Sequence, residues 1–284
     1  MAKKIPSITV DFDEQNKLLD EHYSSITTTP GYGNISRAIT PGGREGDDSH
    51  FSNSKTSNWV GDEAVSVASR IKHMIEAPKS SELVAAYFDA DSSFSGDTFD
   101  SVGTNDPFTF SVDDLLALTM LDVGLKPPAV RAVLGPGQVR LSELLRAIPH
   151  DQPLWEATGE TLSAANDLFV ELDALPAVGA VNAGKLMARK RPRLIPVIDK
   201  HVIAALQAPK STYWTTMRDA LGMNELWQQV ERTLRGSTPT NVSTLRLLDV
   251  AIWMRLSEAD SARLVRSRLG LPVTPRKPRD PPSI

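Results

Sequence analysis

The chain contains no cysteine, which excludes disulfides, thiol nucleophiles, cysteine-ligated zinc and cysteine-ligated iron–sulfur clusters. It also has no uninterrupted apolar stretch of the roughly 18 residues that a membrane-spanning helix needs, and its N-terminus lacks the apolar core of a signal peptide. We therefore expect a cytoplasmic protein without membrane association. With 284 residues, 40% of them hydrophobic, it can build one large domain or two small ones.

Recognisable cofactor and metal motifs are also missing. The sequence has no Walker loop, no dinucleotide-binding fingerprint and no nucleophile elbow, and its five histidines show no zinc-ligand spacing. Residues 89–100 imitate a calcium loop, but Phe94 stands where glycine is needed and Asp100 replaces the longer glutamate. We read this stretch as an acidic loop and expect no metal site.

Charge is divided unequally along the chain. Residues 175–284 hold 18 Lys and Arg against 8 Asp and Glu, a net charge of +10, whereas residues 1–174 hold 13 against 27, a net charge of −14. A basic region of this kind is expected of a domain that binds a polyanion such as nucleic acid. The alternative is that the basic half pairs with the acidic half of the same protein.

Composition divides the chain into four segments. Residues 1–60 are rich in turn formers and indicate a largely irregular, partly disordered extension, with one strand over residues 7–12. Residues 61–110 form a helical and acidic segment, residues 111–271 a helical domain, and residues 272–284 a disordered, Pro-rich basic tail. The expected fold class is mainly α.

Hydrophobic periodicity places the helices. Apolar side chains recur at three- and four-residue steps from Asp62 until the pattern stops at Pro78. Further helices are expected from Ser81, from Val112, and over Ser142–Ile148, Thr161–Ala174, Asn182–Lys190, Lys200–Gln207, Thr212–Leu221, Glu225–Leu234, Val242–Leu256 and Glu258–Leu269.

One segment joins two helices by a tight turn. The first helix ends at Ala174, the turn is Leu175-Pro176-Ala177-Val178-Gly179, and another helix starts at once. This pattern predicts a helix-hairpin-helix. Backbone N–H groups at the start of the second helix lack intrahelical partners, which favours the binding of a phosphate there.

A basic run follows the hairpin. It brings six positive side chains into sixteen residues: Lys185, Arg189, Lys190, Arg191, Arg193 and Lys200. Asp199 is the only acid among them, so we expect its carboxylate to stay ionised. An aspartate before Lys200-His201-Val202 is also what the start of a helix prefers, so a plain capping role is the alternative.

The hairpin and the aspartate together resemble the helix-hairpin-helix DNA glycosylases, the superfamily of endonuclease III and 3-methyladenine glycosylase. The family motif is a Leu-Pro-Gly-Val-Gly hairpin, a helix, and a Val-Asp-x-x-Val element that holds the catalytic aspartate at a helix start. Leu175–Gly179 resembles the hairpin and residues 197–202 resemble the second element, with Gly179 and Asp199 separated by 20 positions as in the motif. The resemblance covers about 30 residues, and the helical region 111–269 is compatible with the rest of that fold.

The sequence departs from the family motif at three points. Ala177 replaces the first hairpin glycine, which weakens a close approach of the backbone to a phosphate. Val181 stands where strand-cleaving relatives have a lysine nucleophile. The lack of cysteine removes the iron–sulfur module of many relatives. The resemblance is therefore to the cluster-free, monofunctional branch, as a divergent member.

The resemblance implies an enzyme that flips a damaged or modified base out of duplex DNA and hydrolyses its N-glycosidic bond, leaving an abasic site. Asp199 would stabilise the positive charge that builds on the sugar, and orient or deprotonate the attacking water. The expected DNA contacts are Ala177, Gly179, Val181, Lys185, Arg189, Lys190, Arg191, Arg193 and Lys200. The candidates to stack on the base are Tyr213, Trp214, Trp227 and Trp253.

The sequence does not identify the base that is excised, and it leaves other classes of protein as alternatives. Housekeeping excision of an alkylated or deaminated base is one target. Modified bases in foreign or phage DNA are another, because the acidic region before residue 111 has no counterpart in the motif. A noncatalytic helix-hairpin-helix DNA-binding protein and a structural or interaction protein are the other readings. We expect a monomer that binds double-stranded DNA without a cofactor. The sequence does not decide whether a monovalent cation binds at the hairpin.

Overall fold

The computed structural model describes residues 54–273, with side chains from residue 61 onward apart from that of Lys210. Every regular element in this range is a helix, which confirms the mainly α fold class. The strand expected over residues 7–12 and most of the expected tail lie outside the described residues. Within the described range, no helix combines the length and the apolar character needed to cross a membrane.

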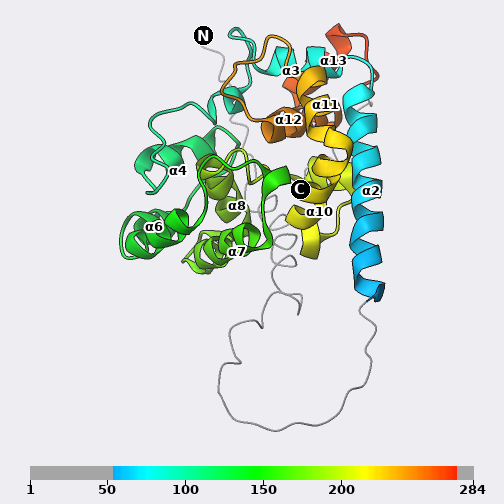
Figure 1. Cartoon of the computed structure of the whole chain (residues 1–284). Helices are drawn as coiled ribbons and strands as arrows, with labels where there is room; N and C mark the ends of the chain where they lie inside the picture. The colour runs from blue at the N-terminus through cyan, green and yellow to red at the C-terminus, as the bar shows by residue number, and fades with distance from the viewer. Residues whose placement is uncertain (1–53, 274–284) are drawn as a thin grey trace, which may run out of the picture.

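The helices form two groups that lie side by side (Figure 1). The central group, α4 to α8, comes from one continuous stretch of chain, whereas the terminal group combines helices from both ends of the described range. The central group is α4 (Val112–Thr119), α5 (Pro127–Leu134), α6 (Gln138–Ala147), α7 (Gly159–Ala174) and α8 (Gly179–Lys190). The terminal group is α2 (Ser54–Glu76), α3 (Ser80–Tyr87), α9 (Lys200–Leu206), α10 (Tyr213–Gly222), α11 (Leu226–Leu234), α12 (Thr244–Leu256) and α13 (Asp260–Arg268).

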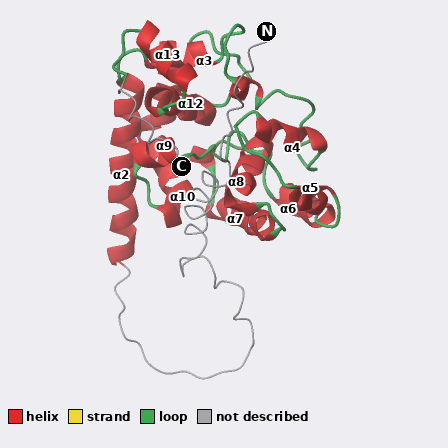
Figure 2. Ribbon diagram, turned by 180° about the vertical axis from the view of Figure 1, so that it is seen from behind, coloured by secondary structure: helices red, strands yellow, loops and turns green. Residues whose placement is uncertain are grey.

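Each group is held by packing between its own helices. In the terminal group the long helix α2 lies along α10 and α11, and α3 packs on α12. In the central group α8 packs on α7 and α4, and α6 packs on α7 and α5, as the view from behind also shows (Figure 2). The two groups share one hydrophobic core, in which buried side chains run from Val67 to Ala262.

The shared core corrects one predicted boundary. Residues 61–110 do not form a segment apart from residues 111–271, because α2 and α3 bury Val67, Ile71 and Leu83 in the same core as the C-terminal helices. An amphipathic helix such as α2 needs a partner for its apolar face, and its partners here lie more than a hundred residues further along the chain.

The periodic segments became helices close to the predicted bounds. Short connections of 3₁₀ type separate some of them: η1 (Ser95–Thr98), η2 (Leu154–Glu156), η3 (Lys210–Thr212) and η4 (Met223–Glu225). Two differences stand out. Helix α2 begins at Ser54, within the predicted extension, and α5 was absent from the predicted helices. Proline occupies the first positions of α5, where its missing N–H costs nothing.

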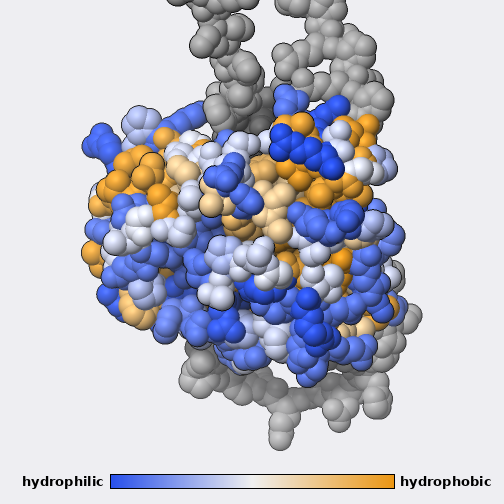
Figure 3. Space-filling view, turned by 90° about the horizontal axis from the view of Figure 1, so that it is seen from above, coloured by the Kyte–Doolittle hydropathy of each residue, from blue (hydrophilic) through white to orange (hydrophobic). Residues whose placement is uncertain are grey.

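The outer surface is mixed in character. Seen from above, hydrophobic side chains reach the surface in several patches that hydrophilic side chains separate (Figure 3). Exposed large apolar residues occur on several helices, among them Val65, Val139 and Leu264. Scattered apolar side chains of this kind are ordinary on a protein surface and do not by themselves mark a binding face.

Candidate active site

The predicted hairpin is present between α7 and α8. Helix α7 ends at Ala174, α8 begins at Gly179, and the two helices pack against each other. Ala177 and Gly179, at the two glycine positions of the motif, both have left-handed backbone conformations, with φ of 59° and 71°. Pro176 and Ala177 are exposed, so the backbone of the turn is accessible to a ligand, whereas the side chain of Val181 is buried.

Most of the basic run is buried, although its residues were expected to contact DNA at the surface. Lys185, Arg189, Lys190 and Arg191 are all buried. Arg189 donates to the carbonyl oxygens of Phe99 and Val102, each at 2.5 Å. Arg191 donates to the carbonyl oxygens of Leu145 and Ile148. Donors directed at backbone oxygens inside the protein are not available to DNA phosphates.

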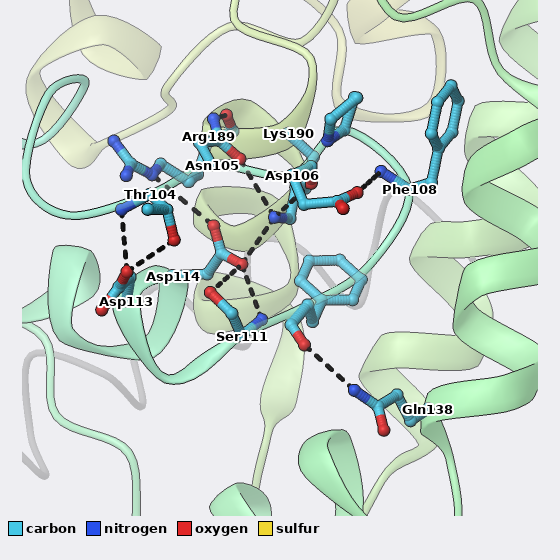
Figure 4. A network of polar contacts seen from close by, with 12 residues as sticks. Thr104, Asn105, Asp106, Phe108, Ser111, Asp113, Asp114, Gln138, Arg189 and Lys190 are labelled. Atoms are coloured by element: carbon cyan, nitrogen blue, oxygen red, sulfur yellow. Dashed lines mark hydrogen bonds and ion pairs between the residues drawn. The ribbon is translucent and has the colours of Figure 1, made fainter.

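Asp114 anchors two of these cations (Figure 4). Its Oδ2 lies 2.5 Å from Nζ of Lys190, and its Oδ1 lies 3.6 Å from Nε of Arg189. The same carboxylate accepts from the backbone N–H of Ser111, which completes a capping box at the start of α4. Lys190 also donates to Oδ1 of Asn105 and to the carbonyl oxygen of Asp106. The buried cations therefore tie the 99–107 loop and α4 to α8.

These contacts correct the expected DNA interface. Arg189 and Lys190 pair with Asp114 of the acidic half, whereas Arg191 donates to backbone carbonyl oxygens such as that of Pro107. Lys185 is also withdrawn from the surface, but it lines a cavity that is described below. Of the run, only Arg193 and Lys200 are exposed, and Arg193 forms an ion pair of 2.9 Å with Asp151. Charge counted along a sequence does not report which face of a helix it occupies.

Asp199 is the N-cap of α9. Its Oδ1 accepts from the backbone N–H groups of His201, at 2.8 Å, and Val202, at 2.9 Å. No described residue donates a hydrogen bond to Oδ2. The capping role considered for this residue is therefore present, and it occupies one oxygen of the carboxylate. The other oxygen is left for a ligand.

Asp199 lines a cavity of about 230 Å³ between the two helix groups. The central group contributes Lys185 from α8 and Leu121 and Asp122 from the segment after α4. The terminal group and the loop after α3 contribute the other walls, including Tyr87, Phe94, Gly96, Arg246, Asp249 and Trp253. The cavity thus joins charged groups of both signs to a group of aromatic rings.

Three aromatic rings form one wall of the cavity. Tyr87 and Phe94 stack at 5.0 Å between ring centroids, and Trp253 meets both rings edge-on. Gly96 lets the loop approach this wall, because a Cβ built there would lie 2.0 Å from the hydroxyl oxygen of Tyr87. A wall of this kind offers apolar contact to a flat ring.

Trp253 is the one base-stacking candidate that lines the cavity. Trp227 stacks on Trp155 at 4.8 Å, with the two rings nearly parallel, and Trp214 packs edge-on against Phe169. Tyr213 is buried in the core, and its hydroxyl group has no hydrogen-bond partner. Tyr213 is thus a core residue, and Trp214 and Trp227 are partly buried against the core. None of the three lines the cavity, which corrects their predicted place beside the flipped base.

Arg246 holds the cavity wall together. It forms ion pairs with Asp249 and, at 3.3 Å, with Asp100, and it donates to the hydroxyl of Tyr87 and to the carbonyl oxygen of Gly96. Burial opposes its charge, but the nearby Tyr87, Asp249 and Asp100 raise the pKa of Arg246 above its usual value. The guanidinium stays charged and fixes the loop after α3 against α12.

Lys185 and Asp249 are buried groups with altered acidity. Burial lowers the pKa of Lys185 to about 8, although Asp199 and Asp249 favour its charged form. The Lys185 ammonium donates to the carbonyl oxygen of Leu121 at 3.1 Å. Burial raises the pKa of Asp249 to about 7, against the attraction of Arg246. An amine and a carboxyl that titrate near neutral pH in one cavity are typical of a functional site.

Sequence reasoning located Asp199 and Trp253 but missed most of the cavity. Tyr87 and Phe94 precede the motif by about a hundred residues, and Arg246 and Asp249 follow it by about fifty. One signal was present in the sequence: Arg246 and Asp249 are charged residues, three positions apart, in a helix that is apolar apart from these two and Thr244 and Arg255 near its ends. Charged residues are rarely buried without a partner, so such a pair indicates a buried site.

Comparison with known proteins places the chain only at the level of a family. A family of unknown function, DUF6308, matches residues 80–256. No curated protein and no solved structure matches the chain. The matched region includes the loop after α3, the hairpin and α12, and so contains most of the residues that line the cavity.

Proposed function

The chain belongs to DUF6308, a family of unknown function, and we propose that it is a monofunctional DNA N-glycosylase. The observation that carries the proposal is the position of Asp199. It follows the hairpin and α8 and caps α9 with its Oδ1. It also lines the cavity with the aromatic wall, and no described residue donates a hydrogen bond to its Oδ2. A carboxylate so placed can stabilise positive charge on a sugar whose base has entered the cavity.

The hairpin would hold the DNA backbone. Its exposed residues Pro176 and Ala177 bring the backbone of the turn to the surface beside the start of α8, where a phosphate can bind. Lys200, exposed and next to Asp199, is the remaining basic side chain at the site that can contact the backbone. The flipped base would then lie against Trp253, Tyr87 and Phe94.

The test compares the wild-type protein with Asp199→Asn and Asp219→Asn. Asparagine caps helices about as well as aspartate, so Asp199→Asn keeps the fold and removes the charge. Asp219 pairs with Arg218 outside the cavity and serves as the matched control. End-labelled duplexes with alkylated or deaminated bases, unmodified DNA and hypermodified phage DNA are incubated with each protein and then treated with alkali.

Alkali-dependent breaks from wild type and Asp219→Asn, but not from Asp199→Asn, are the expected result. The duplex that breaks distinguishes housekeeping repair from action on foreign DNA. Breaks that form without alkali would instead identify a strand-cleaving enzyme and overturn the monofunctional assignment. DNA binding that weakens with salt but yields no abasic sites from any duplex overturns the proposal in favour of a noncatalytic binding protein.

A further inference from the structure

Asp249 is another carboxyl group of the cavity beside Asp199, and one ion-pair partner is recorded for it, Arg246. The residue is 5% exposed and lies on α12. Its Oδ2 accepts from Arg246, one turn earlier in the helix. No described residue donates a hydrogen bond to Oδ1, so this oxygen is available to a ligand in the cavity.

The groups around Asp249 contain more acids than bases. Lys185 approaches from α8, and Arg246 lies on the same helix, but Arg246 is shared with Asp100 of the loop after α3. The remaining titratable groups near Asp249 are Asp199 from α9, Tyr87 from α3 and Tyr213 from α10, with Asp122 elsewhere on the cavity lining. The cavity lining therefore holds three carboxyl groups, Asp122, Asp199 and Asp249, against two cations, Lys185 and Arg246.

An excess of carboxyl groups in a buried site favours the retention of a proton on one of them. Asp199 has two backbone donors on its Oδ1. Asp249 has no backbone donor and is more deeply buried, and its pKa is raised to about 7. Two carboxyl groups in one cavity with different environments are suited to different roles, one as acid and one as anion.

We propose that Asp249 is the proton donor to the departing base, and that the preferred substrates are therefore neutral bases. This inference rests on the proposed glycosylase function. The proton on the Asp249 carboxyl moves to a ring nitrogen of the base while the C1′–N bond breaks, and the bonding electron pair leaves with the base. Water then attacks C1′ and gives a proton to Asp199 or to solvent. A base that already carries a positive charge leaves without such a donor.

The experiment measures single-turnover release of two bases, one of which needs a proton donor in order to leave and one of which does not. One duplex carries a single hypoxanthine, which is neutral, and the other a single 7-methylguanine, which is cationic. The proteins are the wild type, Asp249→Asn and Asp100→Asn. Asp100 is the matched control, because it is also buried and paired with Arg246 but does not line the cavity.

Asp249→Asn should slow the release of hypoxanthine by about 100-fold or more, the usual contribution of a general acid, and that of 7-methylguanine by less than about 10-fold. Asp100→Asn should change both rates by the same factor, because its effect is on the position of Arg246. In the wild type, release of hypoxanthine should fall as the pH rises through about 7, where Asp249 loses its proton, while release of 7-methylguanine lacks this decline.

Three results overturn the role of Asp249: equal losses on both duplexes, the same alkaline decline for both bases, or release of 7-methylguanine alone by the wild type. The wild-type pH profiles decide the question even where Asp249→Asn fails to fold. Absence of release from every duplex overturns the proposed function, and this inference with it. The experiment thus distinguishes an error in the role of Asp249 from an error in the proposed glycosylase function.

Discussion

Ala177 has a backbone conformation that L-residues adopt at a cost. Its φ of 59° lies in the left-handed region, where an alanine is roughly 1–2 kcal/mol less stable than in the right-handed one. The structure thus retains the backbone geometry of a glycine at a position where the sequence has none. The hairpin keeps its shape because α7 and α8 pack on both sides of it.

Ala177→Gly should therefore stabilise the protein. The relief of strain exceeds the roughly 0.4–1 kcal/mol that a glycine loses through the greater freedom of the unfolded chain, which leaves a gain of up to about 1 kcal/mol. Equilibrium denaturation in urea measures it. Ala183→Gly is the control with the opposite sign, because Ala183 lies inside α8 and glycine there costs about 1 kcal/mol. A loss of stability in Ala177→Gly would contradict this account.

Asp199 shows how far a single residue could be predicted. The sequence indicated both an N-cap and a catalytic carboxylate, and the structure confirms the cap and places the residue on a cavity. Local pattern suffices for a cap, because capping involves only the next three residues. Asp249 gave a weaker signal, its spacing from Arg246 in a largely apolar helix, because its place in the cavity depends on Lys185 of α8 and Asp199 at the start of α9.

Among the elements, α8 has an unusual composition for a buried helix. Eleven of its twelve residues are buried, including the three cations Lys185, Arg189 and Lys190. Burying charge is costly unless each charge is paired and hydrogen-bonded. Asp114 supplies the counter-charge for Arg189 and Lys190, so the position of α8 depends on one carboxylate of α4.

Asp114→Asn should destabilise the protein by about 3–5 kcal/mol, because it leaves two buried cations without their counter-charge. Thermal and urea denaturation measure the loss. Asp113→Asn is the matched control on the same turn of α4: Asp113 accepts from the backbone and the hydroxyl of Thr104 at the surface. Its substitution should cost much less. Similar losses in the two variants would show that the buried ion pairs do not stabilise the fold.

The order of the helices was predictable, but the orientation of the basic run was not. Periodicity reports which positions of a helix are apolar, and it placed the predicted helices close to their observed bounds. Arginine and lysine count as polar in any such pattern. Arg189 and Arg191 are nevertheless among the most deeply buried large side chains, because the loop 99–107 provides backbone acceptors that no periodicity reveals.

At the scale of the whole molecule, the basic run exposes little positive charge. Of the basic run, Lys200 is exposed at the start of α9, and Arg193 is paired with Asp151. If DNA meets the protein at the hairpin and the cavity, only a few phosphates are contacted by side chains. We therefore expect the salt dependence of DNA binding to be shallow.

Lys200→Ala tests this arrangement. Loss of one phosphate contact should make the slope of log affinity against log salt concentration shallower by about 0.9, together with weaker binding to every sequence. Lys72→Ala, on α2, is the control and should leave the slope unchanged, because Lys72 pairs with Glu76. Fluorescence anisotropy at several salt concentrations gives both slopes. Identical slopes for Lys200→Ala and the wild type would place the DNA elsewhere on the surface.

The packing of α2 against α10 and α11 constrains how the protein can be made on the ribosome. During synthesis, the apolar face of α2 emerges long before its partner helices, since α10 begins at Tyr213 and α2 ends at Glu76. The central helices can assemble in the meantime from neighbouring stretches of chain. The cavity forms only when α12 arrives, so the nascent chain stays incomplete, and exposed to aggregation or chaperone capture, until α12 has left the ribosome.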